Sequence, residues 1–194
     1  MSLNETPVSE RVQIGFLGNV NAGKSSIINA ITGQNISVVS ELKGTTTDTV
    51  KKTMELHKAG PVVLIDTPGL SDDGEIGSLR MKATMKALDS VNVAVIVTTP
   101  AETDADIEPL IKLCREKDIP YIVVCNKMDG FAGNAEDIHA DILVSAKEKT
   151  NIEELKNLLE EKIILFNESK TERFIISDKL KKNSLVTLVI PIDE

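Results

Sequence analysis

Residues 18–25 of this 194-residue chain, GNVNAGKS, restrict its fold more than any other segment. They fit the pattern GxxxxGK followed by Ser or Thr, in which glycines let the backbone curve so that successive N–H groups point at a phosphate. The apolar run Val12–Leu17 precedes them, and a helical pattern over Lys24–Thr32 follows. A phosphate-binding loop requires this order of strand, loop and helix, so the sequence predicts a P-loop domain.

The residues of this segment are expected to contact a bound nucleotide in different ways. Lys24 would bring a positive charge to the β- and γ-phosphate oxygens and so take part in catalysis, while the Ser25 hydroxyl would ligate Mg2+. The N-terminus of the following helix adds a favourable dipole. Nucleotide contacts are predicted for Gly18, Asn19, Asn21, Ala22, Gly23, Lys24, Ser25 and Ser26.

A second segment, Asp66-Thr67-Pro68-Gly69, ends the apolar run Val62–Ile65. Its position after a strand places the Asp66 carboxylate at the same edge of the sheet, where we expect it to hold Mg2+ through a water. The Gly69 N–H has no side chain in its way and is expected to reach the γ-phosphate, which gives Gly69 a catalytic role. An ordinary turn after a strand is the alternative.

A third segment, Gly44–Asp48 (GTTTD), lies in a long polar loop. A threonine there can ligate Mg2+ only while the γ-phosphate is present, which would make the loop an order–disorder switch. We expect Thr46 to be that ligand and a catalytic residue, and Thr45 to contact the nucleotide beside it. Threonine and glycine are also common in loops without a function, so this segment alone leaves the assignment open.

The base is expected to be guanine because Asn126-Lys127-Met128-Asp129 follows the apolar run Tyr121–Cys125. Guanine carries two N–H donors on one edge, and a single carboxylate, that of Asp129, can accept both. Adenine would leave this acceptor unpaired, at a cost of about 1 to 3 kcal/mol. The tetrapeptide therefore predicts binding of GTP and GDP.

Five further residues are predicted to complete the base site. Asn126 should fix its loop and approach the base, and the stem of Lys127 should cover the face of the ring. Ser145-Ala146-Lys147 follows the last expected strand of the domain, where the Ala146 N–H would meet the guanine carbonyl oxygen. The expected base contacts are Asn126, Lys127, Asp129, Ser145, Ala146 and Lys147.

Short apolar runs alternate with amphipathic stretches along the chain, which is typical of a largely parallel sheet with helices on both faces. The predicted fold is therefore α/β, a mostly parallel six-stranded sheet of the P-loop NTPase kind (Ras-like G domain). Only the second and third strands, separated by Lys58–Pro61, should form an antiparallel hairpin. The expected strands are 12–17, 49–57, 62–66, 91–98, 121–125 and 142–144, and the expected helices are 24–32, 77–89, 104–116, 135–139 and 152–163.

The chain is expected to divide into three parts. Residues 1–10 form a flexible N-terminus, residues 11–166 the nucleotide-binding domain, and residues 167–194 a linker and the first strand of a truncated following domain. That strand, Leu185–Pro191, would otherwise be an unpaired edge, which invites association. A final strand docked on the same sheet is the alternative.

Composition excludes several classes of function. A net charge of -8 makes nucleic acid an unexpected partner, because nucleic-acid binding depends on Lys and Arg. Without a long apolar run or a signal sequence, we expect no membrane contact and a cytoplasmic location. The two cysteines, Cys114 and Cys125, lie in apolar stretches and are expected to be core thiols, so no iron–sulfur cluster is expected on this chain.

The expected reaction is in-line attack of water on the γ-phosphate. Leu70 occupies the position where many GTPases carry a water-orienting glutamine, so intrinsic turnover should be slow. Asn21 could help to coordinate a monovalent cation beside the phosphates, or it could only shape the turn. Potassium stimulation is the hypothesis that follows from the first possibility.

The complete motif set resembles the translation-factor-like bacterial GTPases, which include tRNA-modification and ribosome-assembly enzymes. GTTTD, the run Gly60–Leu70 with Asp72–Gly77, and the terminal Leu188–Asp193 resemble more closely the FeFe-hydrogenase maturation GTPase. The resemblance implies a nucleotide switch in assembly of the hydrogenase active site (H-cluster), with hydrogenase-maturation proteins as partners. It also implies a preference for potassium with Asn21 as a ligand, and a homodimer for the full-length parent through a following dimerisation domain.

Two alternatives remain at this stage. The first is an RNA-associated GTPase of ribosome assembly or tRNA modification, which predicts a basic module after the nucleotide-binding domain. The second is a nucleotide-gated interaction module whose hydrolysis is incidental, which the aliphatic Leu70 favours.

Overall fold

Six strands form one sheet in the computed structural model, which describes residues 11–33, 50–69 and 84–171. The strand order is β2-β3-β1-β4-β5-β6. β1 pairs in parallel with both β3 and β4, β5 pairs in parallel with β4 and β6, and β2 runs antiparallel to β3. The strands are β1 (Val12–Gly18), β2 (Val50–Leu56), β3 (Gly60–Asp66), β4 (Val93–Thr98), β5 (Tyr121–Cys125) and β6 (Ile142–Leu143).

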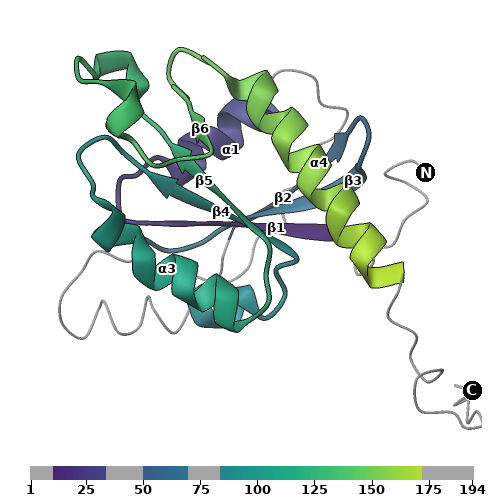
Figure 1. Cartoon of the computed structure of the whole chain (residues 1–194). Helices are drawn as coiled ribbons and strands as arrows, with labels where there is room; N and C mark the ends of the chain where they lie inside the picture. Colours follow the sequence, from purple (N-terminus) through teal and green to yellow (C-terminus); the bar gives the residue numbers. More distant parts are fainter. Residues whose placement is uncertain (1–10, 34–49, 70–83, 172–194) are drawn as a thin grey trace, which may run out of the picture.

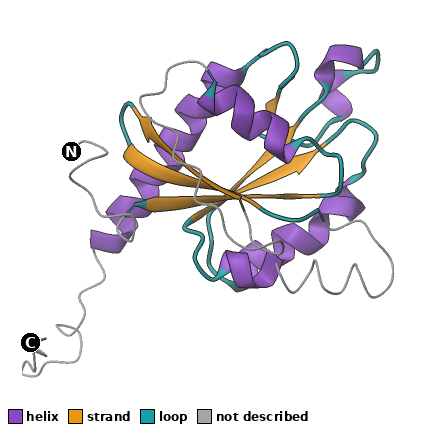
Figure 2. Ribbon diagram, turned by 180° about the vertical axis from the view of Figure 1, so that it is seen from behind, coloured by secondary structure: helices purple, strands orange, loops and turns teal. Residues whose placement is uncertain are grey.

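Helices cover both faces of this sheet (Figure 1). One face carries α1 (Lys24–Thr32) and α4 (Ile152–Thr171), and the other carries α3 (Asp104–Glu116) and a helical turn at residues 84–88. The view from behind shows the same three layers, with the strands between the helices (Figure 2). The expected fold class is confirmed.

The alternation of side chains along β4 explains why the sheet needs both layers. Every residue of β4 is buried. Val93, Val95 and Val97 pack with residues of α1 and α4, whereas Ala94 and Ile96 pack with residues of α3. Strands buried on both faces are typical of parallel sheets, because the crossover helices lie on either side.

Most elements agree with the sequence prediction, and the differences have local causes. α1, α3 and β5 have the predicted bounds. α4 continues eight residues beyond the predicted end at Ile163, because no glycine or proline interrupts residues 164–171. The helix predicted at 135–139 is instead a single 3-10 turn, η3 (Ala135–Asp137), in which the Asn134 side chain accepts from the Glu136 N–H.

Some predicted features lie outside the described residues. These are residues 1–10, the GTTTD segment (44–48), residues 77–83 of the helix predicted at 77–89, and the segment beyond Thr171. Among the described helices, none has the length and apolar character that crossing a bilayer requires.

Candidate nucleotide-binding site

Four connections that follow parallel strands meet at one edge of the sheet. They follow β1, β3, β5 and β6, and each begins at the carboxyl end of its strand. In open α/β sheets this edge is where ligands bind, because the helix N-termini and the connecting loops gather there. The structure thus brings three of the predicted motifs and the Ser145–Lys147 segment to one place.

The loop between β1 and α1 has the curved backbone of a phosphate cradle. Gly23, at the N-terminus of α1, has a φ of 93°, and Asn21 has a φ of 64°, both in the left-handed region. A Cβ at Gly23 would lie 2.2 Å from the Nδ2 atom of Asn126, so glycine is required here for space as well as conformation. The Ala22 N–H donates to the Asn19 carbonyl at 3.3 Å and closes the turn.

The Lys24 ammonium lies inside this curve. The residue is 7% exposed, and its Nζ donates to the carbonyl oxygens of Gly18 at 3.1 Å and Asn19 at 2.9 Å. A bound phosphate would offer charged oxygens in place of these neutral carbonyls. Hydrogen bonds between two charged groups are stronger than hydrogen bonds from an ammonium to a neutral carbonyl. The ammonium is therefore held where it can exchange carbonyl partners for phosphate oxygens.

The Mg2+ ligands predicted in the described residues are in direct contact. The Ser25 hydroxyl donates to Oδ2 of Asp66. Hydroxyl and carboxylate oxygens are hard donors of the kind that Mg2+ prefers, so these two residues fit the ion. The other predicted ligand, Thr46, and its neighbour Thr45 lie outside the described residues.

Gly69 lies against the phosphate-binding loop. A Cβ at Gly69 would come within 2.6 Å of both the Cα and the N of Val20, so no other residue fits without a shift of the backbone. Two hydroxyls hold this turn: that of Thr67 donates to the Phe16 carbonyl at 2.6 Å, and that of Thr84 donates to the Pro68 carbonyl at 3.3 Å. The structure therefore places Gly69 beside the loop that is expected to hold the phosphates.

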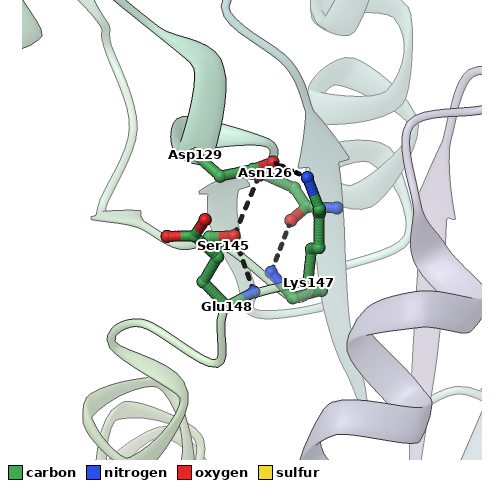
Figure 3. A network of polar contacts seen from close by, with 6 residues as sticks. Asn126, Asp129, Ser145, Lys147 and Glu148 are labelled. Atoms are coloured by element: carbon green, nitrogen blue, oxygen red, sulfur yellow. Dashed lines mark hydrogen bonds and ion pairs between the residues drawn. The ribbon is translucent and has the colours of Figure 1, made fainter.

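The Asn126 amide joins the phosphate half of the site to the base half. Asn126 is 2% exposed, and its Nδ2 donates to the Ala22 carbonyl at 3.0 Å. Its Oδ1 accepts from the Ala146 N–H at 3.1 Å (Figure 3). We expected the Ala146 N–H to face the guanine carbonyl; in this structure it is bonded to Asn126. A cavity of about 380 Å3 opens beside these residues, lined by Gly23, Ser26, Asn126, Lys127, Asp129, Gly130, Ala146 and Lys147.

The Asp129 carboxylate is oriented by the segment after β6 (Figure 3). Oδ1 accepts from the Ser145 hydroxyl at 2.9 Å, and Oδ2 lies 3.4 Å from the Lys147 ammonium. The Ser145 bond is the main reason that the pKa of Asp129 is lowered, and Lys147 adds to the effect. The group is therefore an ionised acceptor at neutral pH, as recognition of two N–H donors requires.

Other predicted residues have less distinctive surroundings. Asn21 is exposed, and its positive φ shows that it shapes the turn.

The thiols of Cys114 and Cys125 are buried, and burial raises the pKa of each to about 11, as expected for core thiols. Within residues 11–33, 50–69 and 84–171, no group of three or more His, Cys, Asp or Glu side chains is arranged to hold a metal.

Glu102 contacts the phosphate-binding loop and was not predicted from the sequence. Glu102 follows β4, and its Oε1 accepts from the Asn19 Nδ2 at 2.6 Å. The signal available in the sequence was an acidic residue just beyond the carboxyl end of a strand next to β1, at the edge where the site lies.

Comparison with known proteins agrees with this geometry. A family model described as "50S ribosome-binding GTPase" matches residues 13–127, more than half of the chain. GTPase Der of Wolinella succinogenes is 35% identical over 139 residues, which are 66% of this chain and 29% of that protein. The tRNA modification GTPase MnmE of Mycoplasmoides gallisepticum is 26% identical over 194 residues, 99% of this chain and 43% of that protein.

MnmE of Aquifex aeolicus is 32% identical over 163 residues, 80% of this chain and 35% of that protein. The chain thus spans less than half the length of each of these curated relatives. Among solved structures, a variant of Aquifex aeolicus Era bound to GDP.AlF4- has a TM-score of 0.62 at 22% identity, covering 77% of this chain and 56% of that one. The G domain of the T. maritima FeoB iron transporter has a TM-score of 0.56 at 22% identity, covering 81% and 99%.

We predict that Asn126→Ala lowers the free energy of unfolding by about 1 to 3 kcal/mol, because the Ala22 carbonyl and the Ala146 N–H lose a buried partner. Urea denaturation followed by circular dichroism measures this change. Asn134→Ala is the matched control, since its side chain bonds to a backbone N–H in an exposed turn and should cost less. Equal losses in the two variants would contradict the bridging role.

Proposed function

Since the chain belongs to the 50S ribosome-binding GTPase family, we propose that it binds GTP with Mg2+ and acts as a switch whose state changes on hydrolysis to GDP. The observation that carries this proposal is the buried Asn126 amide, which ties a phosphate cradle to a pocket that presents an ionised carboxylate. These two halves suit a guanine nucleotide, because one binds the phosphates and the other accepts two N–H donors.

The residues of the chain supply position and charge for phosphoryl transfer, and no covalent nucleophile is needed. Lys24 would leave the Gly18 and Asn19 carbonyls for the β- and γ-phosphate oxygens. The Gly69 N–H would orient the terminal phosphate. Ser25 and Asp66 would hold Mg2+, which neutralises charge on the phosphate oxygens when bound.

The switch itself is proposed to lie in the loop that carries Thr46. A ligand to Mg2+ from this loop would depend on the γ-phosphate, so the loop would be released after hydrolysis. Leu70, which cannot polarise water, makes slow intrinsic turnover part of the proposal. Both residues lie outside the described part of the chain.

The process served by the switch has two candidates. The description of the family and the names of its relatives Der and MnmE favour the RNA-associated alternative over hydrogenase maturation. A solved relative, Era, is described in complex with nucleotides of 16S ribosomal RNA. We therefore place a role in ribosome assembly or tRNA modification first. Hydrogenase maturation is second, favoured by the Gly60–Leu70 sequence and by the net charge of -8.

For base selection, we predict that Asp129→Asn lowers affinity for GTP at least tenfold and raises affinity for xanthosine triphosphate. An amide N–H can face the carbonyl that xanthine carries in place of the guanine amino group, whereas it cannot accept both guanine donors. Calorimetry with GTP, XTP and ATP measures the change. Asp137→Asn, in the exposed η3 turn, should leave all three affinities unchanged. GTP binding that the Asp129 change does not weaken would refute the assignment.

For the monovalent cation, we predict that potassium raises the rate of GTP hydrolysis above the rate in sodium, and that Asn21→Ala removes the difference. The physical reason is an amide oxygen that adds a ligand for a cation beside the phosphates. Phosphate release at equal ionic strength in KCl and NaCl is the measurement. Equal rates for the unaltered protein would leave Asn21 with its turn-shaping role alone.

For the process, we predict that the GTP-bound protein sediments with ribosomal subunits or retains tRNA on a filter, and that GDP weakens this association. The salt dependence of this association should be shallow, because the chain has a net charge of -8 and few basic contacts to offer phosphates. Cell-free activation of an FeFe hydrogenase, with and without the protein, measures the second candidate. Activation of the hydrogenase by the protein, without any association with RNA, would place hydrogenase maturation first among the two candidate processes.

A further inference from the structure

The carboxylate of Glu102 connects the end of β4 to the phosphate-binding loop. Its Oε1 accepts from the Asn19 Nδ2 at 2.6 Å, across 83 positions in the sequence. Its Oε2 accepts from the Thr98 hydroxyl at 3.0 Å and from the Thr99 N–H at 2.8 Å. Both oxygens are therefore engaged, one toward the loop and the other toward the sheet.

The segment that carries Glu102 is held on both sides. Its own N–H donates to the Thr99 carbonyl at 3.0 Å, which closes a turn directly after β4. The next residue, Thr103, is the N-cap of α3. The Asp106 carboxylate, in the first turn of α3, accepts from the Thr103 N–H at 2.7 Å and from its hydroxyl at 2.9 Å. A carboxylate fixed between a buried strand and a capped helix can in turn fix what it binds.

Asn19 transmits this position to the atoms that shape the loop. Its carbonyl accepts from the Lys24 ammonium at 2.9 Å and from the Ala22 N–H at 3.3 Å. The side chain of Asn19 thus binds Glu102, while its backbone carbonyl forms part of the loop's turn. A shift of Asn19 would displace the turn and the resting place of Lys24 together.

We propose that Glu102 is a positioning residue for the phosphates: by holding Asn19, it keeps the loop curved before the nucleotide arrives. The inference rests on the proposed function and adds a residue to it. A cradle that is already formed avoids the ordering cost of binding, so loss of the anchor weakens affinity without removing any contact to the ligand. Because the loop surrounds the β-phosphate, GDP and GTP are affected and GMP is not.

The test is a double-mutant cycle on the full chain, with Asn19→Ala, Glu102→Ala and the double variant. Each single change should lower the affinity for GDP and for GTP about tenfold, as expected for the loss of a hydrogen bond to a charged group. The double variant should bind GDP and GTP about as tightly as the single variant of lower affinity, because both changes remove the same hydrogen bond. Affinity for GMP, measured by competition against a fluorescent GDP, should change less than twofold in all three.

Two further variants separate positioning from general damage to the fold. Glu102→Gln should bind GDP within about threefold of the unaltered protein, because the Asn19 amide can turn and accept from the new amide while the remaining oxygen still serves Thr98 and Thr99. Glu108→Ala removes the same charge from an exposed position on α3, where it pairs with Arg115, and should change nothing.

Several results would overturn the inference. They are an additive double variant, about a hundredfold weaker for GDP; single variants that bind GDP normally; or a loss for GMP equal to that for GDP. Failure of the unaltered chain to bind GTP would remove the proposed function, and this inference with it. Normal GTP binding together with unaffected variants would remove this inference alone.

Discussion

The buried amide of Asn126 is the interaction on which the rest of the site depends. It lies at the end of β5, donates to the loop after β1 and accepts from the segment after β6. One side chain therefore sets the spacing between the phosphate cradle and the base pocket. Asn126 is 2% exposed, and its bond to the Ala22 carbonyl is buried, so losing it would leave that carbonyl unsatisfied in the interior.

Around this bridge, the polar groups that would bind ligand are paired with one another. Lys24 bonds to two loop carbonyls, Ser25 bonds to Asp66, and Asp129 accepts from Ser145. Charged and polar groups in a partly buried site need partners in every state. Binding a nucleotide and its metal then exchanges one set of partners for another, so the site can be preorganised without an uncompensated charge.

The sequence predicted the elements whose signals are local. α1 begins at the glycine of the phosphate-binding motif, and β5 is a continuous apolar run, so their bounds were correct. The predicted end of α4 at Ile163 was wrong. The amphipathic pattern fades after that residue, but no glycine or proline ends the helix before Thr171. The predicted helix at 135–139 was wrong because so short a stretch cannot repay the nucleation of an α-helix, and it forms a 3-10 turn.

Motif spacing alone determined the fold class, and it predicted a phosphate-binding loop and a carboxylate for guanine, because each depends on residue types at fixed separations along the chain. Only the tertiary structure decided how the motifs connect. It turned the Asn126 amide toward Ala22, engaged the Ala146 N–H, and placed Glu102 against Asn19. These contacts join residues from 20 to 104 positions apart, and such pairs meet only because parallel strands bring their carboxyl ends to one edge.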